Sequence, residues 1–228
     1  MPLIPPSPLL SLRPLYFILY FSLYLHLRPH YLGYMKRVQL IGIAWLYLCC
    51  FPAVTASASS DQMKFFSCTD YHCDTGKMVS LTPGQWQSIR NLFSADSSPA
   101  EERENIRYAI ALLENMVGAI TGTWRDLAGN FAGAGQPGQL DCISESKNTS
   151  TYLQLMFDDG LLKWHEVEER QVRHPFIFNT HWTAVIADRS NGERFAVDSW
   201  FRDNGQPPHI QPLADWLKGR KMEEQAAK

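Results

Sequence analysis

The spacing of the apolar residues changes once along the chain, near Asp158-Asp159-Gly160. Upstream of this point, apolar residues recur at the spacing of one helix face. Downstream, they form short runs rich in Val, Ile, Phe, Trp and Thr, which are typical of strands. A chain that has helices first and strands afterwards builds an α+β domain. The sequence therefore predicts N-terminal helices, followed by a helix that packs on an antiparallel sheet.

Local signals mark where these elements begin. A capping box with proline at the first helical position occurs at Thr82–Gln85 and again at Ser98–Glu101. Asp141 is predicted to be the N-cap of a third helix, and Asn191-Gly192 marks a turn between two strands. Helices are therefore predicted over 82–93, 98–120 and 141–157, and strands over 162–173, 180–188 and 194–200.

The N-terminal quarter of the chain predicts export. Met35-Lys36-Arg37 is a short basic segment, residues 38–54 form an apolar core, and Ala56-Ser57-Ala58 matches a small-residue cleavage site. A signal peptide over 35–58, cleaved after Ala58, would leave the mature protein periplasmic or secreted. The apolar core is short for a stable membrane span, and anchoring in the membrane through residues 38–54 is the alternative.

The remaining chain divides simply. Residues 1–34 are best interpreted as an upstream extension caused by a start codon placed too early, and a first membrane helix is the alternative. Residues 59–219 are predicted to form a single domain and residues 220–228 a polar tail.

The predicted mature chain is acidic. Residues 1–58 hold four of the 21 Lys and Arg and no Asp or Glu, which leaves 17 basic against 23 acidic residues. Such an acidic domain is a poor candidate for binding nucleic acid or anionic lipid.

The five cysteines have different expected roles. Cys49 and Cys50 would leave with the signal peptide. Cys68 and Cys73 are predicted to form a disulfide in an oxidising compartment, worth about 2 kcal/mol for so short a loop. A metal site that adds His72 and Asp74 is the alternative, although these adjacent ligands make a poor tetrahedral set. Cys142 then remains single, and a buried structural cysteine is its simplest interpretation.

A nucleophilic role for Cys142 is the competing interpretation. The N-terminus of a helix favours a thiolate and should lower the pKa of Cys142. His181 and Asp198 lie downstream on two neighbouring predicted strands. A nucleophilic cysteine needs a base to accept its proton, and the base needs a third group to orient it. Cys142, His181 and Asp198 supply all three and are the predicted catalytic triad.

This triad requires a particular hairpin. A four-residue loop, Arg189–Gly192, would set Asp198 opposite Thr183 and diagonal to His181 on the same face of the sheet. A two-residue turn would set Asp198 opposite Val185, about 13 Å from His181 along the strand. A three-residue loop would place the two side chains on opposite faces. The triad therefore predicts the four-residue loop.

The same residues resemble a known family. The segments Asp-Cys-Ile-Ser-Glu-Ser (141–146), His-Trp-Thr-Ala-Val-Ile (181–186) and Arg-Phe-Ala-Val-Asp-Ser-Trp (194–200) are similar to the transglutaminase-like cysteine peptidase superfamily, in particular its smaller bacterial members. The resemblance covers residues 138–202. It implies a papain-like α+β core and thiol chemistry on amide or acyl groups of a peptide, protein or cell-envelope substrate. The superfamily also contains members that have lost catalysis, so fold alone does not imply activity.

Several assignments stay open at this point. The oxyanion donor could be the backbone N–H of Cys142 or the side chain of Gln139 or Trp182. His165 is interpreted as a strand residue. A non-catalytic domain that binds a peptide, glycan or partner protein is the main alternative to an enzyme. An NlpC-type murein endopeptidase is a further one, although that type carries a second His or a short polar residue where this chain has Asp198. No metal or other cofactor is expected.

Overall fold

The computed structural model describes residues 62–93, 97–174 and 180–220. The predicted upstream extension, the signal peptide with its alternative membrane anchor, and the tail beyond residue 220 lie outside these residues. Within the described ranges, no helix is both long and apolar enough to cross a membrane. The protein is an α+β domain whose strands pair antiparallel.

The first described element is a hairpin that the sequence did not predict. Strand β1 (Met63–Cys68) pairs with β2 (Gly76–Leu81), and Phe65 lies opposite Val79. The two strands bury Phe65, Val79 and Leu81. The predicted order of helices first and strands afterwards is therefore wrong at this end. No tight-turn signal marked the hairpin, because a disulfide loop connects its strands.

The three predicted helices are confirmed. They are α3 (Pro83–Arg90), α4 (Pro99–Thr121) and α5 (Cys142–Asp158). Both capping boxes form in both directions, and the Asp141 side chain accepts the backbone N–H of Ser144 at 2.9 Å. Helix α4 ends where Gly122 takes a left-handed conformation, φ 96°, which a side chain would strain. Short 3₁₀ turns cover Tyr71–Cys73, Thr123–Arg125 and Phe131–Gly133.

The second sheet contains the three predicted strands and one more. Its order is β3-β4-β5-β6, from β3 (His165–Arg173) through β4 (His181–Asp188) and β5 (Arg194–Asp198) to β6 (His209–Pro212). Strand β6 and the short helix α6 (Leu213–Leu217) were not predicted. Strand β5 ends at Asp198, two residues earlier than predicted.

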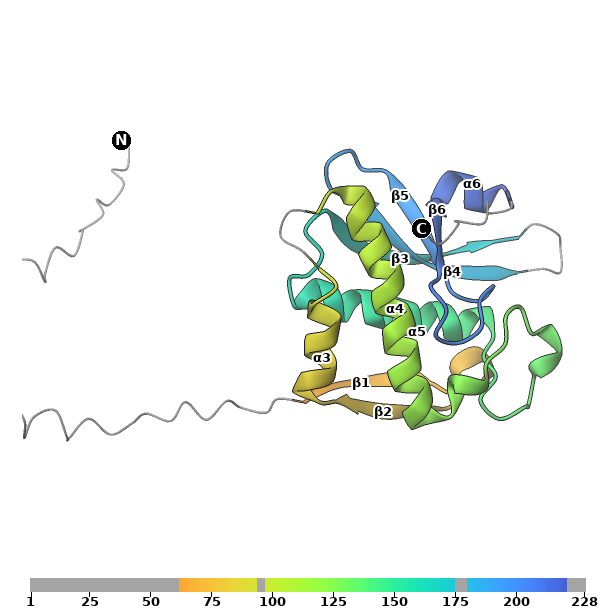
Figure 1. Cartoon of the computed structure of the whole chain (residues 1–228). Coiled ribbons are helices and arrows are strands. Elements are labelled where there is room, and N and C mark those ends of the chain that lie inside the picture. The colour runs from red at the N-terminus through yellow and green to blue at the C-terminus, as the bar shows by residue number, and fades with distance from the viewer. Residues whose placement is uncertain (1–61, 94–96, 175–179, 221–228) are drawn as a thin grey trace, which may run out of the picture. The chain divides into compact units, whose positions relative to one another are not determined.

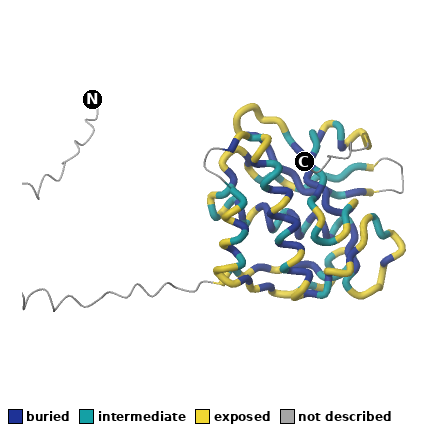
Figure 2. The backbone as a smooth tube through the Cα atoms, in the orientation of Figure 1, coloured by how far each residue is buried: buried dark blue, intermediate teal, exposed yellow. Residues whose placement is uncertain are grey.

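Helix α5 lies between the hairpin and the four-stranded sheet (Figure 1). It contacts β1 on one side and β3, β4 and β5 on the other, while α4 packs across it. Buried residues gather on these helices and on the central strands, and exposed residues lie mainly in the connections (Figure 2). The core includes Val79, Leu81, Ile106, Ile110, Leu113, Leu153, Met156, Ala184 and Ile186.

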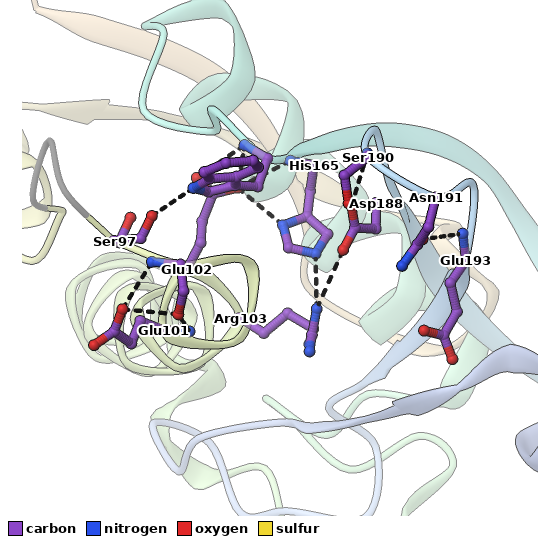
Figure 3. A network of polar contacts seen from close by, with 11 residues as sticks. Ser97, Glu101, Glu102, Arg103, His165, Asp188, Ser190, Asn191 and Glu193 are labelled. Carbon is purple, nitrogen blue, oxygen red and sulfur yellow. Dashed lines mark hydrogen bonds and ion pairs between the residues drawn. The ribbon is translucent and has the colours of Figure 1, made fainter.

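A buried polar network ties the start of α4 to the sheet (Figure 3). The Glu102 carboxylate accepts the backbone N–H of Lys163 at 2.8 Å and both the backbone N–H and Nδ1 of His165, at 3.0 and 2.9 Å. Arg103 lies between Nε2 of His165, at 3.2 Å, and the Asp188 carboxylate, at 3.8 Å. His165 is fully buried here, which agrees with its interpretation as a structural strand residue.

We expect Glu102→Gln to lower the free energy of unfolding at pH 7 by about 3 kcal/mol, because an amide would face donors that a buried carboxylate now satisfies. Burial opposes ionisation of Glu102, but its hydrogen bonds, above all to His165, outweigh burial and hold its pKa below the usual 4.5. The difference between the proteins should therefore shrink as the pH falls below 4.5. Urea denaturation measures it, with the exposed Glu166→Gln as control. Equal losses in both variants would contradict the role of the network.

Candidate active site

The hairpin between β4 and β5 has the register that the triad requires. Ala184 pairs with Val197 and Ala187 with Arg194, and the backbone N–H of Asp188 donates to the Glu193 carbonyl at 2.8 Å. The loop between these strands is therefore Arg189–Gly192, four residues long. Continuing the register sets Asp198 opposite Thr183, as the sequence predicted.

His181 and Asp198 meet inside the protein. Nε2 of His181 lies 2.7 Å from Oδ2 of Asp198, and the two residues are 4% and 2% exposed. The indole N–H of Trp216 donates to the same Asp198 oxygen at 2.7 Å. Arg173 holds Trp216 in turn, with its guanidinium 4.5 Å from the indole centroid. The sequence analysis did not include Trp216 in the site, because nothing in the sequence marks α6 as part of it.

Aromatic rings enclose the imidazole of His181. Its ring centroid lies 5.0 Å from that of Trp200, 4.9 Å from Phe201 and 5.5 Å from Trp216. Phe131 packs edge-on against Trp200, with centroids 4.5 Å apart. These rings fix the orientation of the imidazole and exclude water from its bond to Asp198, which strengthens that bond electrostatically.

Cys142 opens α5 and lies against the start of β4. Its Sγ donates to the Thr180 carbonyl at 3.8 Å, and the backbone N–H of Trp182 points to the thiol. Thr180 and Trp182 flank His181 in the chain. The Thr180 carbonyl and the Trp182 N–H face the same edge of β4 as the Asp188 N–H, which donates to the Glu193 carbonyl just before β5. Strand β5 stops at Asp198, so this stretch of the β4 edge is left for the N-terminus of α5. The structure thus places Cys142 against the two residues that flank His181, where the charge of Asp198 acts on the thiol.

The imidazole has one ring nitrogen left for the thiol. Nδ1 of His181 is buried and has no hydrogen-bond partner within the described part of the chain. A buried polar atom without a partner is costly, and such atoms recur where a catalytic step supplies the partner. A thiol proton transferred to Nδ1 would place an imidazolium between the Cys142 thiolate and the Asp198 carboxylate.

The predicted lowering of the Cys142 pKa is wrong for the resting site. Burial raises the pKa of the thiol, and the nearby carboxylates of Asp141 and Asp198 raise it further. The backbone N–H groups of Trp182 and of Cys142 itself act in the opposite direction without outweighing burial. The helix terminus alone therefore does not lower the pKa of this thiol below its usual value.

A cavity of about 300 Å³ opens at the thiol. The residues that line it are Tyr71, His72, Asn130, Phe131, Asp141, Cys142, Ile143, Thr180, Trp182 and Trp200. Trp182, one of the two predicted oxyanion side chains, lines the cavity and directs its backbone N–H at the thiol. That N–H and the backbone N–H of Cys142 both act on the thiol.

Gln139, the other predicted oxyanion donor, is engaged elsewhere. Its amide oxygen accepts the backbone N–H of Leu127 at 3.3 Å and the Asn130 side chain at 2.5 Å, and its amide nitrogen donates to the Arg125 carbonyl. Gln139 therefore secures the loop that precedes α5, and the prediction for this residue is corrected. A glutamine close in sequence to the cysteine cannot by itself reveal where its amide points.

The Cys68–Cys73 disulfide forms, and it replaces the alternative of a metal site at these cysteines. The closed loop packs on the first turns of α5, where Asn148 pairs with both backbone groups of Cys68 at 2.8 and 3.2 Å. Ser144 donates to the Asp70 carbonyl from the same helix face. Tyr71, held by the Asn130 carbonyl, projects from this loop into the cavity wall.

Three buried carboxyl groups lie behind the first turn of α5. Burial raises the pKa of Glu114 to about 8, against hydrogen bonds from Gly205 and Ser199. Burial also raises the pKa of Asp126 to about 6, although Glu145 donates to it. The pKa of Glu145 rises well above its usual value because of burial and the charges of Glu114 and Asp126. Burial thus favours the neutral form of all three carboxyl groups, and Glu145 and Asp126 are joined by a hydrogen bond.

Replacing Glu114 by Gln should remove a pH-dependent loss of stability. The folded protein keeps a proton on Glu114 up to about pH 8, whereas the unfolded chain loses it near 4.5. Stability contributed by this proton is complete below 4.5 and falls as the pH rises to about 8, by up to about 1.4 kcal/mol per pH unit. Urea denaturation of both proteins from pH 5 to 8 measures the difference. Glu104→Gln on the same helix, 46% exposed, is the control, and parallel pH slopes for Glu114→Gln and the unaltered protein would contradict the expectation.

Known proteins give no independent assignment of this site. No family model, no curated protein and no solved structure matches the chain. The case for a family and for a function therefore depends on the motifs around Cys142, His181 and Asp198 and on their geometry.

Proposed function

We propose that the protein is a thiol hydrolase or acyltransferase that acts on amide or acyl groups. The observation that carries this proposal is the buried His181–Asp198 pair, joined at 2.7 Å, beside a cysteine at a helix N-terminus. A nucleophile, a base and a group that orients the base are the minimal set for acyl transfer through a thioester. The proposed destination of the thiol proton is Nδ1 of His181, which is buried and has no hydrogen-bond partner among the residues that the structure describes.

The proposed reaction has two stages. Nδ1 of His181 takes the Cys142 proton as Sγ attacks the substrate carbonyl, and the backbone N–H groups of Trp182 and Cys142 stabilise the oxyanion. The leaving group departs with the proton from His181, which leaves an acyl thioester on Cys142. An acceptor, water or an amine, then attacks the thioester and releases the thiolate. Asp198 stays ionised throughout and stabilises the imidazolium form of His181.

The proposal extends to family and location. A helix that opens with the cysteine, followed by strands with the His and the Asp, is the pattern of the transglutaminase-like cysteine peptidases with their papain-like core. The Cys68–Cys73 disulfide is consistent with an oxidising compartment. Together with the predicted signal peptide over 35–58, it supports a periplasmic or secreted enzyme with a peptide, protein or cell-envelope substrate.

A non-catalytic domain on the same fold is the second candidate. Two observations favour it: burial raises the pKa of Cys142, and the thiol hydrogen bond goes to Thr180 rather than to His181. In such a domain Cys142 would be a packed structural residue, and the cavity would bind a ligand without reacting with it. The NlpC-type alternative has less support, because the third group here is a buried carboxylate that Trp216 also holds.

Alkylation of Cys142 in the full chain by iodoacetamide separates the candidates. If His181 accepts the thiol proton, His181→Ala should slow the reaction at pH 7 by at least about 10-fold, since one pKa unit changes the thiolate fraction tenfold. At pH 10 the thiol ionises without a base, so the two rates should converge. His174→Ala, an exposed histidine, is the matched control, and Cys142→Ala gives the background. A thiol that reacts slowly at every pH and ignores His181 would favour the binding domain.

The role of Trp216 can be tested with Trp216→Phe, which keeps an aromatic ring beside His181 but removes the hydrogen bond to Asp198 and part of the buried ring system. We expect alkylation at pH 7 to slow by about 3- to 10-fold, because the loss of one hydrogen bond to a buried charge weakens the positioning of His181. The rate at pH 10 should not change. Trp164→Phe removes the indole hydrogen bond to Ser97 and serves as the control, and an equal effect of the two substitutions would rule out a specific role.

A further inference from the structure

A second histidine–aspartate pair borders the same cavity. Nδ1 of His72 lies 3.1 Å from Oδ2 of Asp141, the residue that caps α5 and precedes Cys142. Both His72 and Asp141 line the cavity that contains Cys142. A neutral imidazole with its hydrogen on Nδ1, facing the carboxylate, would keep its lone pair on Nε2. This is the arrangement of a general base oriented by a carboxylate.

The backbone holds His72 in a costly conformation. His72 and Cys73 have positive φ angles of 59° and 60°, which residues with side chains seldom adopt. The surrounding contacts enforce this geometry: the disulfide closes the loop, Lys147 donates to the His72 carbonyl at 3.2 Å, and Ser144 donates to Asp70. Strained residues that persist because their surroundings fix them cluster at functional sites. The strain here presents one side chain, that of His72, to the cavity.

The two pairs differ in their access to solvent. The side chains of His181 and Asp198 are 5% and 1% exposed, whereas those of His72 and Asp141 are 63% and 12% exposed. Aromatic rings cover His181, which suits a base that exchanges its proton with the adjacent thiol. The acceptor in the second stage arrives from solvent, and the exposed pair is the one that it meets.

We propose that His72, oriented by Asp141, is the general base that activates the acceptor when the acyl thioester on Cys142 is broken. With water as acceptor, Nε2 of His72 takes one proton while the water oxygen bonds to the thioester carbon. The carbon–sulfur bond breaks and its electron pair returns to Sγ of Cys142. The other proton of the water stays on the product carboxyl group, and His72 returns its proton to solvent. The inference rests on the proposed thiol chemistry and divides its two stages between two histidines.

The test separates formation and breakdown of the thioester in the full chain, with p-nitrophenyl acetate as the probe. The burst of p-nitrophenolate reports acylation of Cys142, and mass spectrometry of the isolated acetyl-enzyme follows its hydrolysis. His72→Asn is the variant of choice, because Asn tolerates a positive φ better than most residues and cannot act as a base. We expect a burst rate within about twofold of the unaltered protein and hydrolysis of the acetyl-enzyme slower by roughly 10- to 100-fold.

Two further measurements distinguish a base from a structural residue. Added imidazole should accelerate hydrolysis of the acetyl-enzyme in His72→Asn more than in the unaltered protein, while Asp74→Asn on the same loop should behave normally. An unchanged melting temperature for His72→Asn would confirm that the loop is intact. Hydrolysis at the normal rate in His72→Asn, or a slow rate that imidazole does not restore, would overturn the role of His72. A missing burst in the unaltered protein would refute the proposed function and this inference with it.

Discussion

The Asp198 carboxylate is the point at which the last third of the chain is joined. One of its oxygens accepts Nε2 of His181 from β4 and Nε1 of Trp216 from α6, each at 2.7 Å. A charge so deeply buried is tolerated only with such partners. The two bonds therefore fix the ends of β4 and β5 and the position of α6 together. The end of β5 at Asp198 also shapes the site, because it leaves the edge of β4 at Thr180 and Trp182 free to contact Cys142.

Burial acts on the site in two opposing ways. It strengthens the His181–Asp198 bond and excludes water from it, yet it also raises the pKa of Cys142 and of the three carboxyl groups around Glu114. Helix α5 carries both Cys142 and Glu145, so burial raises the pKa of two groups within the first turn of one helix. In the proposed reaction, movement of the proton from sulfur to nitrogen would create two further charges in these buried surroundings.

The sequence predicted those parts of the fold that depend on local chemistry. The capping boxes at Thr82 and Ser98 and the N-cap at Asp141 are satisfied within one helical turn, and all three helices formed as expected. The spacing of His181 and Asp198 implied a four-residue loop, and the register confirmed it. The features that the sequence did not predict depend on contacts between distant residues. They are the hairpin at Met63–Leu81, the hydrogen bond from Trp216, and the burial that raises the pKa of Cys142. The predicted role of Gln139 was wrong because its hydrogen-bond partners, Leu127 and Arg125, belong to a segment without a recognisable sequence pattern.

Because Trp216 lies near the C-terminal end of the described domain, the site is completed late in synthesis of the chain. The disulfide loop and Cys142 both precede Trp216 in the chain, Cys142 by nearly half of the described domain, and they can adopt their local structure early. His181 and Asp198 lack their shared third partner until α6 has followed them out of the ribosome. A chain released before residue 216 would carry a thiol without a properly held base. The proposed thiol chemistry would therefore become available only when synthesis of the domain is nearly finished.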